Sequence, residues 1–233
     1  MTEKSFFSSS EALILEDNFK RITDNINNAK EKAGRNDNIR FMAVTKTVPP
    51  EKINHAISLG IDLLGENRVQ EFTGKYEFYD KNCEIHFIGG LQNNKVKYII
   101  DKVSMIHSVD SIKLAEEINK RAVSSDRIMD ILIEVNIGGE DSKGGVPPEA
   151  VNDLAAYCNE LNGINLRGCM TIPPPSEDSA AYFSRMQQLY LALKEKYPTV
   201  DTLSMGMSSD YEQAVLYGSN IVRIGSALFG SRK

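Results

Sequence analysis

The sequence predicts an α/β protein in which parallel strands close into a TIM-type (β/α)8 barrel, preceded by an N-terminal helix. Short apolar segments typical of strands recur about eight times, and stretches with apolar residues at helical spacing separate them. Such regular alternation requires a parallel sheet. About eight repeats in roughly 250 residues is the number at which a parallel sheet closes, and this chain has 233 residues. An open doubly wound sheet is the alternative.

The first predicted helix begins at a capping sequence of three serines and a glutamate, residues 8–11, and continues to Gly34. The strand 39–45 follows and leads to Lys46. Two prolines suit the first turn of the next helix, which Gly60 ends.

Beyond this point the same alternation continues. Further strands are expected at 61–65, 84–89, 104–109, 128–136, 165–170, 201–205 and 220–224. Further helices are expected at 69–79, around 96–100, at 112–122, 147–161 and 178–197, and in a short segment from Ser209. Ser209 and Glu212 have the spacing of a capping box. Only 226–230 follows the last strand, so the first helix is expected to fill the eighth helical place around the barrel.

The composition is typical of a globular protein in solution. Apolar residues make up 41% and charged residues 25%, and the net charge of −5 argues against non-specific binding to nucleic acid or anionic membranes. No apolar run approaches the ~20 residues of a membrane span, and residues 1–10 do not resemble a signal peptide. Cys83, Cys158 and Cys169 are isolated, which is typical of reduced thiols in the cytoplasm. With no linker or break in composition, one domain is expected over 1–233.

In a closed parallel barrel the loops after the strands meet at one face, where such folds present their chemistry. Lys46 lies at the first of these strand tips, either as a solvated charge or as a nucleophile that condenses with an aldehyde. The other tips are 65–68, 89–90, Ser108, Asn136 with the glycine-rich loop 138–145, 170–171, 205–209 and 223–226.

Two of these tips together predict a phosphate site. Ser208 and Ser209 are expected at a helix N-terminus, where free N–H groups favour an anion. Gly225 and Ser226 follow the last strand, and a glycine there lets the backbone approach a ligand closely. Each tip alone fits a capped helix or a tight turn, but barrels usually bind phosphate at the loops after strands seven and eight. A phosphate site beside a lysine on the adjacent strand indicates a phosphorylated aldehyde, for which pyridoxal phosphate (PLP) is the candidate.

Several motifs that are weak alone form a specific combination. They are A-V-T-K at 43–46, G-E-N-R-V-Q-E at 65–71, H-F-I-G at 86–89, M-T-I-P-P at 170–174, L-S-M-G-M-S at 203–208 and V-R-I-G-S at 222–226. The combination resembles the YggS/PROSC family, the pyridoxal phosphate homeostasis proteins, over nearly the whole chain. The resemblance implies a single barrel related to the N-terminal domain of alanine racemase, a fold-type III PLP-binding barrel.

The resemblance also implies roles for residues at the strand tips. Lys46 would hold PLP as a Schiff base. Asn67 would lie near the cofactor, and Arg223 would approach the pyridine nitrogen. The residues expected to hold the phosphate are Ser208, Gly225 and Ser226, with Met207 beside it. Two positions depart from the family pattern, which usually has a histidine where this chain has Gly90 and a serine where it has Gly138. Gly90 removes a polar side chain from the rim, and Gly138 is expected to loosen a loop.

These features favour a carrier of PLP over an enzyme. An arginine at the pyridine nitrogen keeps that nitrogen unprotonated and weakens the ring as an electron sink. Alanine racemase adds a catalytic tyrosine from another domain and subunit. Here Tyr79 and most other tyrosines are expected on helices away from the mouth, and Tyr211 is expected to be structural. A weak PLP-dependent racemase or lyase is the alternative, and a module that delivers the cofactor to apo-enzymes is a third class. A cytoplasmic monomer is expected.

Some ionisable residues fall inside strands. His86 and His107 are expected in the core or at the mouth rather than on a metal, because no histidine or carboxylate pair has ligand spacing. Asp130 and Glu134 interrupt an apolar strand, and an internal hydrogen-bond network is favoured for them over catalysis.

Overall fold

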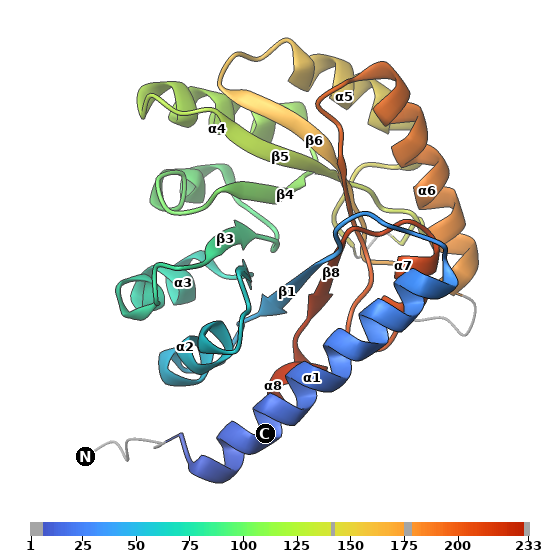
Figure 1. Ribbon diagram of the computed structural model, residues 1–233. Coiled ribbons are helices and arrows are strands. Elements are labelled where there is room, and N and C mark those ends of the chain that lie inside the picture. The colour runs from blue at the N-terminus through green and yellow to red at the C-terminus, as the bar shows by residue number, and fades with distance from the viewer. Residues whose placement is uncertain (1–6, 141–142, 175–178, 231–233) are drawn as a thin grey trace.

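The computed structural model describes residues 7–140, 143–174 and 179–230. Within these ranges eight parallel strands form a closed barrel in chain order, and β8 pairs with β1 to close it (Figure 1). The strands are β1 (Arg40–Val44), β2 (Leu63–Glu66), β3 (Glu84–Phe87), β4 (Met105–Val109), β5 (Met129–Glu134), β6 (Ile164–Met170), β7 (Thr202–Ser204) and β8 (Ile221–Ile224). The predicted barrel is confirmed, and the open sheet is wrong. The expectations for residues 1–6, for 141–142 of the glycine-rich loop and for Asp178 lie outside the described residues.

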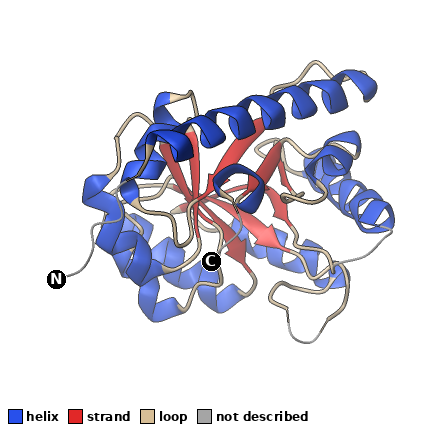
Figure 2. Cartoon of the chain, turned by 90° about the horizontal axis from the view of Figure 1, so that it is seen from below, coloured by secondary structure: helices blue, strands red, loops and turns tan. Residues whose placement is uncertain are grey.

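Helices surround the strands, as Figure 2 shows in blue and red. They are α1 (Ser9–Lys32), α2 (Pro50–Ser58), α3 (Val69–Lys75), α4 (Ile112–Ser124), α5 (Val151–Asn159), α6 (Ser179–Lys196), α7 (Tyr211–Leu216) and α8 (Ser226–Phe229), with 3-10 helices η1 (Tyr76–Phe78), η2 (Asn93–Tyr98) and η3 (Pro148–Ala150). None of the helices in the described ranges combines the length and apolar character that crossing a bilayer requires.

The first helix takes the place that the short C-terminal segment leaves open. Ser8 caps α1 through reciprocal hydrogen bonds with Glu11, as the capping sequence predicts. The helix packs against α2, α7 and α8. Asn18 Nδ2 donates to the carbonyl oxygen of Leu228 in α8 at 3.0 Å, and Asn25 Nδ2 donates to Glu212 Oε1 in α7 at 2.9 Å.

Two predicted helices differ in the structure. The segment after β3 is the 3-10 helix η2, in which Val96 is the buried residue, and its turns close between residues three apart, as from Lys95 N to Gln92 O at 2.8 Å. Ile99 and Ile100, which the prediction placed on this helix, are buried directly after η2 ends. The capping box at Ser209 is also wrong, because α7 starts at Tyr211 and the Glu212 carboxylate bonds Asn25 of α1 instead.

Alternate strand residues point into the barrel, while the largest apolar cluster lies between the sheet and the helices. Two small apolar clusters occupy the interior. One comprises Met42, Leu63, Ile88 and Ile221, and the other comprises Met105, Leu132 and Met170. Four buried polar side chains also point inwards, namely His86, His107, Ser204 and Arg223. We call the end with the C-terminal strand tips the mouth, and the opposite end the lower end.

Candidate functional site

Lys46 lies two residues beyond the last residue of β1, at the mouth, and is half-buried. It lines a cavity of about 330 Å³ together with Lys52, Gly225 and Ser226, among others. Gly225 and Ser226 reach this cavity from the other end of the chain because β8 pairs with β1. The structure therefore brings the predicted lysine and one half of the predicted phosphate site to the same cavity.

Ser208 joins the loops that follow β7 and β8. Its Oγ atom accepts hydrogen bonds from the backbone N–H groups of Gly225 and Ala227, both at 3.2 Å. N–H groups that converge on one oxygen form the kind of nest that also suits an oxygen of an anion. Met207 and Ser208 line a second cavity of about 680 Å³ beside α7. The two tips from which the sequence predicts a phosphate site are thus in direct contact.

Asn67 follows β2 and is half-buried. Its Oδ1 atom is buried and has no hydrogen-bond partner among the described residues. A buried acceptor left without a partner costs about 1–3 kcal/mol, so an atom of this kind at the mouth suits contact with a ligand. Gly89 allows the close approach of the loop, because a Cβ atom there would lie 2.1 Å from the backbone oxygen of Asn67.

Arg223 points from β8 into the barrel and is 3% exposed. Its guanidinium donates to Ser204 Oγ and to the carbonyl oxygen of Thr171, both at 2.8 Å. Burial lowers the pKa of Arg223 to about 10, against the opposing effect of Glu134 and Asp210. Arg223 is therefore a cation at neutral pH, and a guanidinium has five N–H donors, more than these two bonds use.

The predicted site residues do not all line the same cavity. Asn67 and Arg223 line neither of the two cavities. Lys46, Gly225 and Ser226 share a cavity, hydrogen bonds join Ser208 to that group, and Asn67 and Arg223 lie at the same end of the barrel.

A buried carboxyl that is bonded to the residue before the lysine was not singled out from the sequence. Glu66 is fully buried, and its Oε1 atom accepts from Thr45 Oγ1 at 2.6 Å and from the Tyr79 hydroxyl at 2.5 Å. Burial raises the pKa of Glu66, although these two hydrogen bonds oppose the shift. Tyr79, which the sequence predicts away from the mouth, lines neither of the two cavities and reaches the residue before Lys46 only through this carboxyl. The sequence feature that could have revealed this buried carboxyl is a glutamate inside an apolar strand.

The residue after the lysine has an unusual backbone conformation. Thr47 has a φ of 64°, which a β-branched residue rarely adopts. Its N–H group donates to Glu71 Oε1 at 2.6 Å, and Lys75 binds the same carboxylate oxygen. The backbone next to Lys46 is therefore held by Thr47, Glu71 and Lys75. The sequence did not reveal this role, because position 47 lacks the glycine that usually marks a positive φ.

The predictions for the other polar residues inside strands have different outcomes. His86 and His107 are buried in the core and contact each other, with Nδ1 of His86 2.9 Å from Nε2 of His107. The described residues contain no group of three or more side chains able to hold a metal ion. Asp130 belongs to a hydrogen-bond network, as expected, whereas the notable property of Glu134 is a pKa that burial and the nearby Asp110 raise to about 7.

The two glycines that depart from the family pattern differ in their surroundings. A Cβ atom at Gly90 would have nothing within 4 Å, so this position opens onto free space. A Cβ atom at Gly138 would lie 2.3 Å from Cγ of Pro174. Gly138 therefore lets the proline ring pack against this loop, rather than only loosening it.

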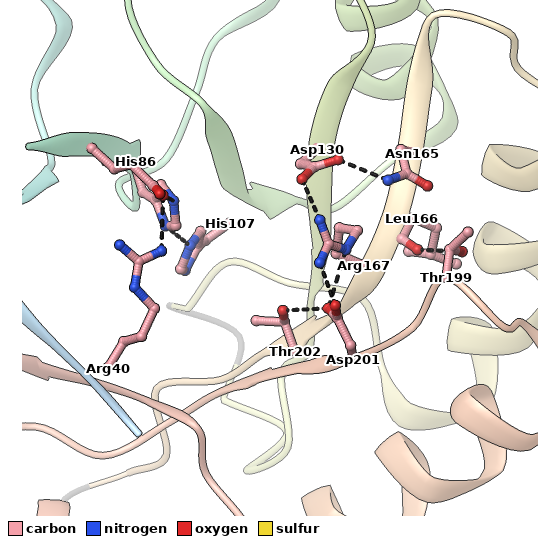
Figure 3. Close-up of polar contacts among 11 residues, drawn as sticks. Arg40, His86, His107, Asp130, Asn165, Leu166, Arg167, Thr199, Asp201 and Thr202 are labelled. Carbon is pink, nitrogen blue, oxygen red and sulfur yellow. Dashed lines mark hydrogen bonds and ion pairs between the residues drawn. The ribbon is translucent and has the colours of Figure 1, made fainter. Parts of the chain in front are cut away.

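The lower end carries a network of a different kind, shown in Figure 3. Arg167 donates to Asp130 at 2.6 Å and also binds Asp201, while Asn165 donates to Asp130 at 2.8 Å. Arg40 donates to Glu84 at 2.8 Å. Each of these charges has a partner of opposite sign.

Comparison with known proteins places this architecture among described families. Residues 18–233 match the family described as "Alanine racemase, N-terminal domain". A "Pyridoxal phosphate homeostasis protein" of Aquifex aeolicus (strain VF5) is 48% identical over 219 residues, which cover 91% of this chain and 96% of that protein.

Two solved structures are similar over most of their length. A crystal structure of an unknown protein from Bifidobacterium adolescentis has a TM-score of 0.91 and 36% identity, and covers 95% of this chain and 97% of its own. PipY of Synechococcus elongatus PCC7942, in a structure with PLP bound, has a TM-score of 0.79 and 27% identity, and covers 93% of this chain and 100% of its own.

Proposed function

Because the chain belongs to the family of pyridoxal phosphate homeostasis proteins, we propose that it binds PLP at the mouth and acts in vitamin B6 homeostasis. The observation that carries this proposal is one cavity lined by the amine-bearing Lys46 and by Gly225 and Ser226. The hydroxyl of Ser208 lies against the backbone N–H groups of that same turn. An amine beside an anion-binding nest fits a small phosphorylated aldehyde.

The residues present fit this cofactor. The N–H groups of Gly225 and Ala227 converge on a single oxygen, which suits a phosphate oxygen equally well. The unpartnered Oδ1 atom of Asn67 and the remaining N–H donors of Arg223 offer further polar contacts at the same end. Lys46 is the residue that would hold the cofactor covalently as a Schiff base, and Met207 would lie beside the phosphate.

When bound, PLP supplies an aldehyde and an electron-withdrawing ring. Arg223 has only donors to offer a ring nitrogen, so it keeps such a nitrogen unprotonated and weakens that electron-withdrawing power. The nearest tyrosines are engaged elsewhere. Tyr79 is bonded to the buried Glu66, and burial raises its pKa. Tyr211 accepts from Asn25 of α1 at 2.9 Å. These features support a carrier rather than an enzyme.

The proposal extends to how the carrier works. We place the protein in the cytoplasm as a monomer with one domain over 1–233, which releases PLP to apo-enzymes that depend on it. The reduced state of Cys83, Cys158 and Cys169 supports the cytoplasmic assignment. A weak amino-acid racemase or lyase is the competing function. Incubation of the PLP-loaded protein with single L- or D-amino acids tests it, and inversion or cleavage of any of them would favour the enzyme.

The direct test is covalent trapping. The purified protein is loaded with PLP, its visible absorbance band is recorded, borohydride is added and the modified peptide is mapped. We expect the label on Lys46 and its loss in Lys46→Ala. Lys52→Ala is the matched control, because Lys52 lines the same cavity but its Nζ atom donates to the carbonyl oxygen of Phe229 at 2.8 Å. A label on Lys52, or a wild-type protein that takes up no PLP, would contradict the proposal.

A further inference from the structure

A continuous line of hydrogen-bonded polar side chains crosses the barrel interior from the mouth to the lower end. Arg223 NH1 donates to Ser204 Oγ at 2.8 Å, and Ser204 Oγ lies 3.1 Å from His107 Nδ1. His107 Nε2 lies 2.9 Å from His86 Nδ1, and His86 Nε2 lies 3.4 Å from Glu84 Oε2. We call these five residues the polar file. Figure 3 shows its lower part, where His86 and His107 contact each other and Arg40 lies nearby.

The interior holds two distinct apolar clusters beside the file. One comes from β1, β2, β8 and the residue after β3, and the other from β4, β5 and β6. Ser204 and His107 are 0% exposed and His86 is 2% exposed, so water does not compensate a lost bond here. Buried polar groups of this kind are retained only when their hydrogen bonds are satisfied.

The chemistry of the donors fixes the direction of every bond in the file. A guanidinium can only donate, so Ser204 Oγ accepts from Arg223. The buried hydroxyl hydrogen of Ser204 needs an acceptor, and among the described residues the atom in place is Nδ1 of His107. His107 then carries its proton on Nε2 and donates to Nδ1 of His86.

His86 in turn carries its proton on Nε2, facing the Glu84 carboxylate. Burial lowers the pKa of both histidines, which agrees with two neutral rings of this tautomer. All donors therefore point from the Arg223 cation towards a carboxylate that Arg40 holds at the lower end. Hydrogen bonds aligned in this way polarise and strengthen one another.

We propose that Ser204, His107 and His86 are positioning residues that hold the Arg223 guanidinium in a fixed plane at the mouth. Two bonds define this plane, one to Ser204 and one to the carbonyl oxygen of Thr171. This proposal rests on the proposed function in one respect, namely that PLP is the ligand that Arg223 contacts. A side chain at the opposite end of the barrel thereby influences how firmly the cofactor is held.

The first test needs no cofactor. Nitrogen-15 NMR of the imidazoles in the full-length protein should report Nε2–H tautomers for both His86 and His107. Ser204→Ala should shift the Nδ1 signal of His107 and broaden the side-chain N–H signals of Arg223, whereas Ser204→Thr, which keeps the hydroxyl, should preserve them. An Nδ1–H tautomer at His107, or Arg223 signals unchanged in Ser204→Ala, would overturn the proposal whether or not PLP binds.

The second test uses PLP. We expect Ser204→Ala and His107→Leu to lose PLP on dilution about ten-fold faster than wild type and to shift the visible absorbance band. Ser204→Ala removes a bond to the charged Arg223, and His107→Leu removes the acceptor that orients the Ser204 hydroxyl. His107→Gln should restore much of both, because its amide oxygen accepts and its amide nitrogen donates in the required order. Arg167→Gln is the matched control, as it disturbs the lower end outside the file. Wild-type loading with unchanged retention and spectrum in both file variants would refute the positioning role and leave the proposed function standing.

Discussion

Both ends of the barrel carry polar side chains, but the two ends pair them differently. At the lower end Arg40, Arg167, Glu84 and Asp130 are bonded to partners of opposite charge around a cavity of about 480 Å³. At the mouth, three buried oxygens have no partner among the described residues: Glu66 Oε2, Asn67 Oδ1 and Ser108 Oγ. The charged side chains of the lower end are therefore paired, whereas the mouth keeps polar atoms without partners. This difference agrees with barrels that keep chemistry at the mouth and stability at the opposite end.

The largest expected effect tests the packing that places Asn67 at the mouth. Gly89→Ala puts a Cβ atom 2.1 Å from the Asn67 backbone oxygen, so one of the two loops must move. We expect the free energy of unfolding to fall by about 3 kcal/mol, with faster loss of PLP. Urea unfolding and PLP retention measure both quantities. Gly90→Ala is the control, because nothing lies within 4 Å of its Cβ position. Equal behaviour of the two variants would contradict the account of Asn67.

A smaller effect tests whether the charges of the lower end that lie outside the polar file only stabilise the fold. Arg167→Ala leaves the Asp130 and Asp201 carboxylates without their shared partner. We expect the free energy of unfolding to fall by about 2 kcal/mol, discounted for partial exposure of the pair. PLP retention in the folded protein should stay at the wild-type value. A variant of normal stability that lost PLP would show instead that the Arg167 network also takes part in binding.

A carboxyl group at each end should also make stability depend on pH, in opposite directions at the two ends. Burial raises the pKa of Glu134, near the mouth, from 4.5 to about 7, so the folded state favours its neutral form. The stability that this preference contributes is complete below pH 4.5 and is lost as the pH rises through about 7. Glu134→Gln should therefore be more stable than wild type by about 1–2 kcal/mol at pH 8 and nearly equal to it at pH 4.5.

Glu84 at the lower end provides the opposite case. The hydrogen bond from His86 and the charge of Arg40 lower its pKa to about 2. Its contribution is present above pH 4.5 and is lost as the pH falls towards 2. Urea unfolding from about pH 2.5 to about pH 8 should thus show Glu84→Gln less stable than wild type at neutral pH, with a difference that narrows below about pH 4.5. Parallel pH profiles for the two variants would rule out this contrast.

The fold was predictable because its signals are local and repeated. Alternation of strand and helix patterns over the chain requires a parallel closed sheet, and the closure places Lys46 beside Gly225. The missed features depend on contacts between distant segments. The Glu66 carboxyl accepts hydrogen bonds from Thr45 and Tyr79, and Ser204 meets His107 across the barrel. No spacing in the sequence reveals these pairs.

The smallest expected effect concerns a backbone conformation with positive φ, which occurs at both ends of the barrel. Thr47 at the mouth and Asp126 in the loop before β5 are the non-glycine residues with positive φ in the described part of the chain, at 64° and 52°. Such strain is more costly for a β-branched residue than for aspartate, which tolerates this region. Thr47→Gly should raise the free energy of unfolding by about 0.5 kcal/mol, after the entropic cost of glycine is subtracted.

Stability alone would not separate the two loops, but PLP release should. The Thr47 N–H group is held by Glu71, and this bond orients the backbone next to Lys46. A glycine at position 47 loosens that backbone, so PLP should dissociate about two- to three-fold faster despite the gain in stability. Asp126→Gly relieves the same kind of strain far from the mouth and should leave the dissociation rate unchanged. If both variants release PLP at the wild-type rate, the strain at Thr47 belongs to the turn and has no part in holding the lysine.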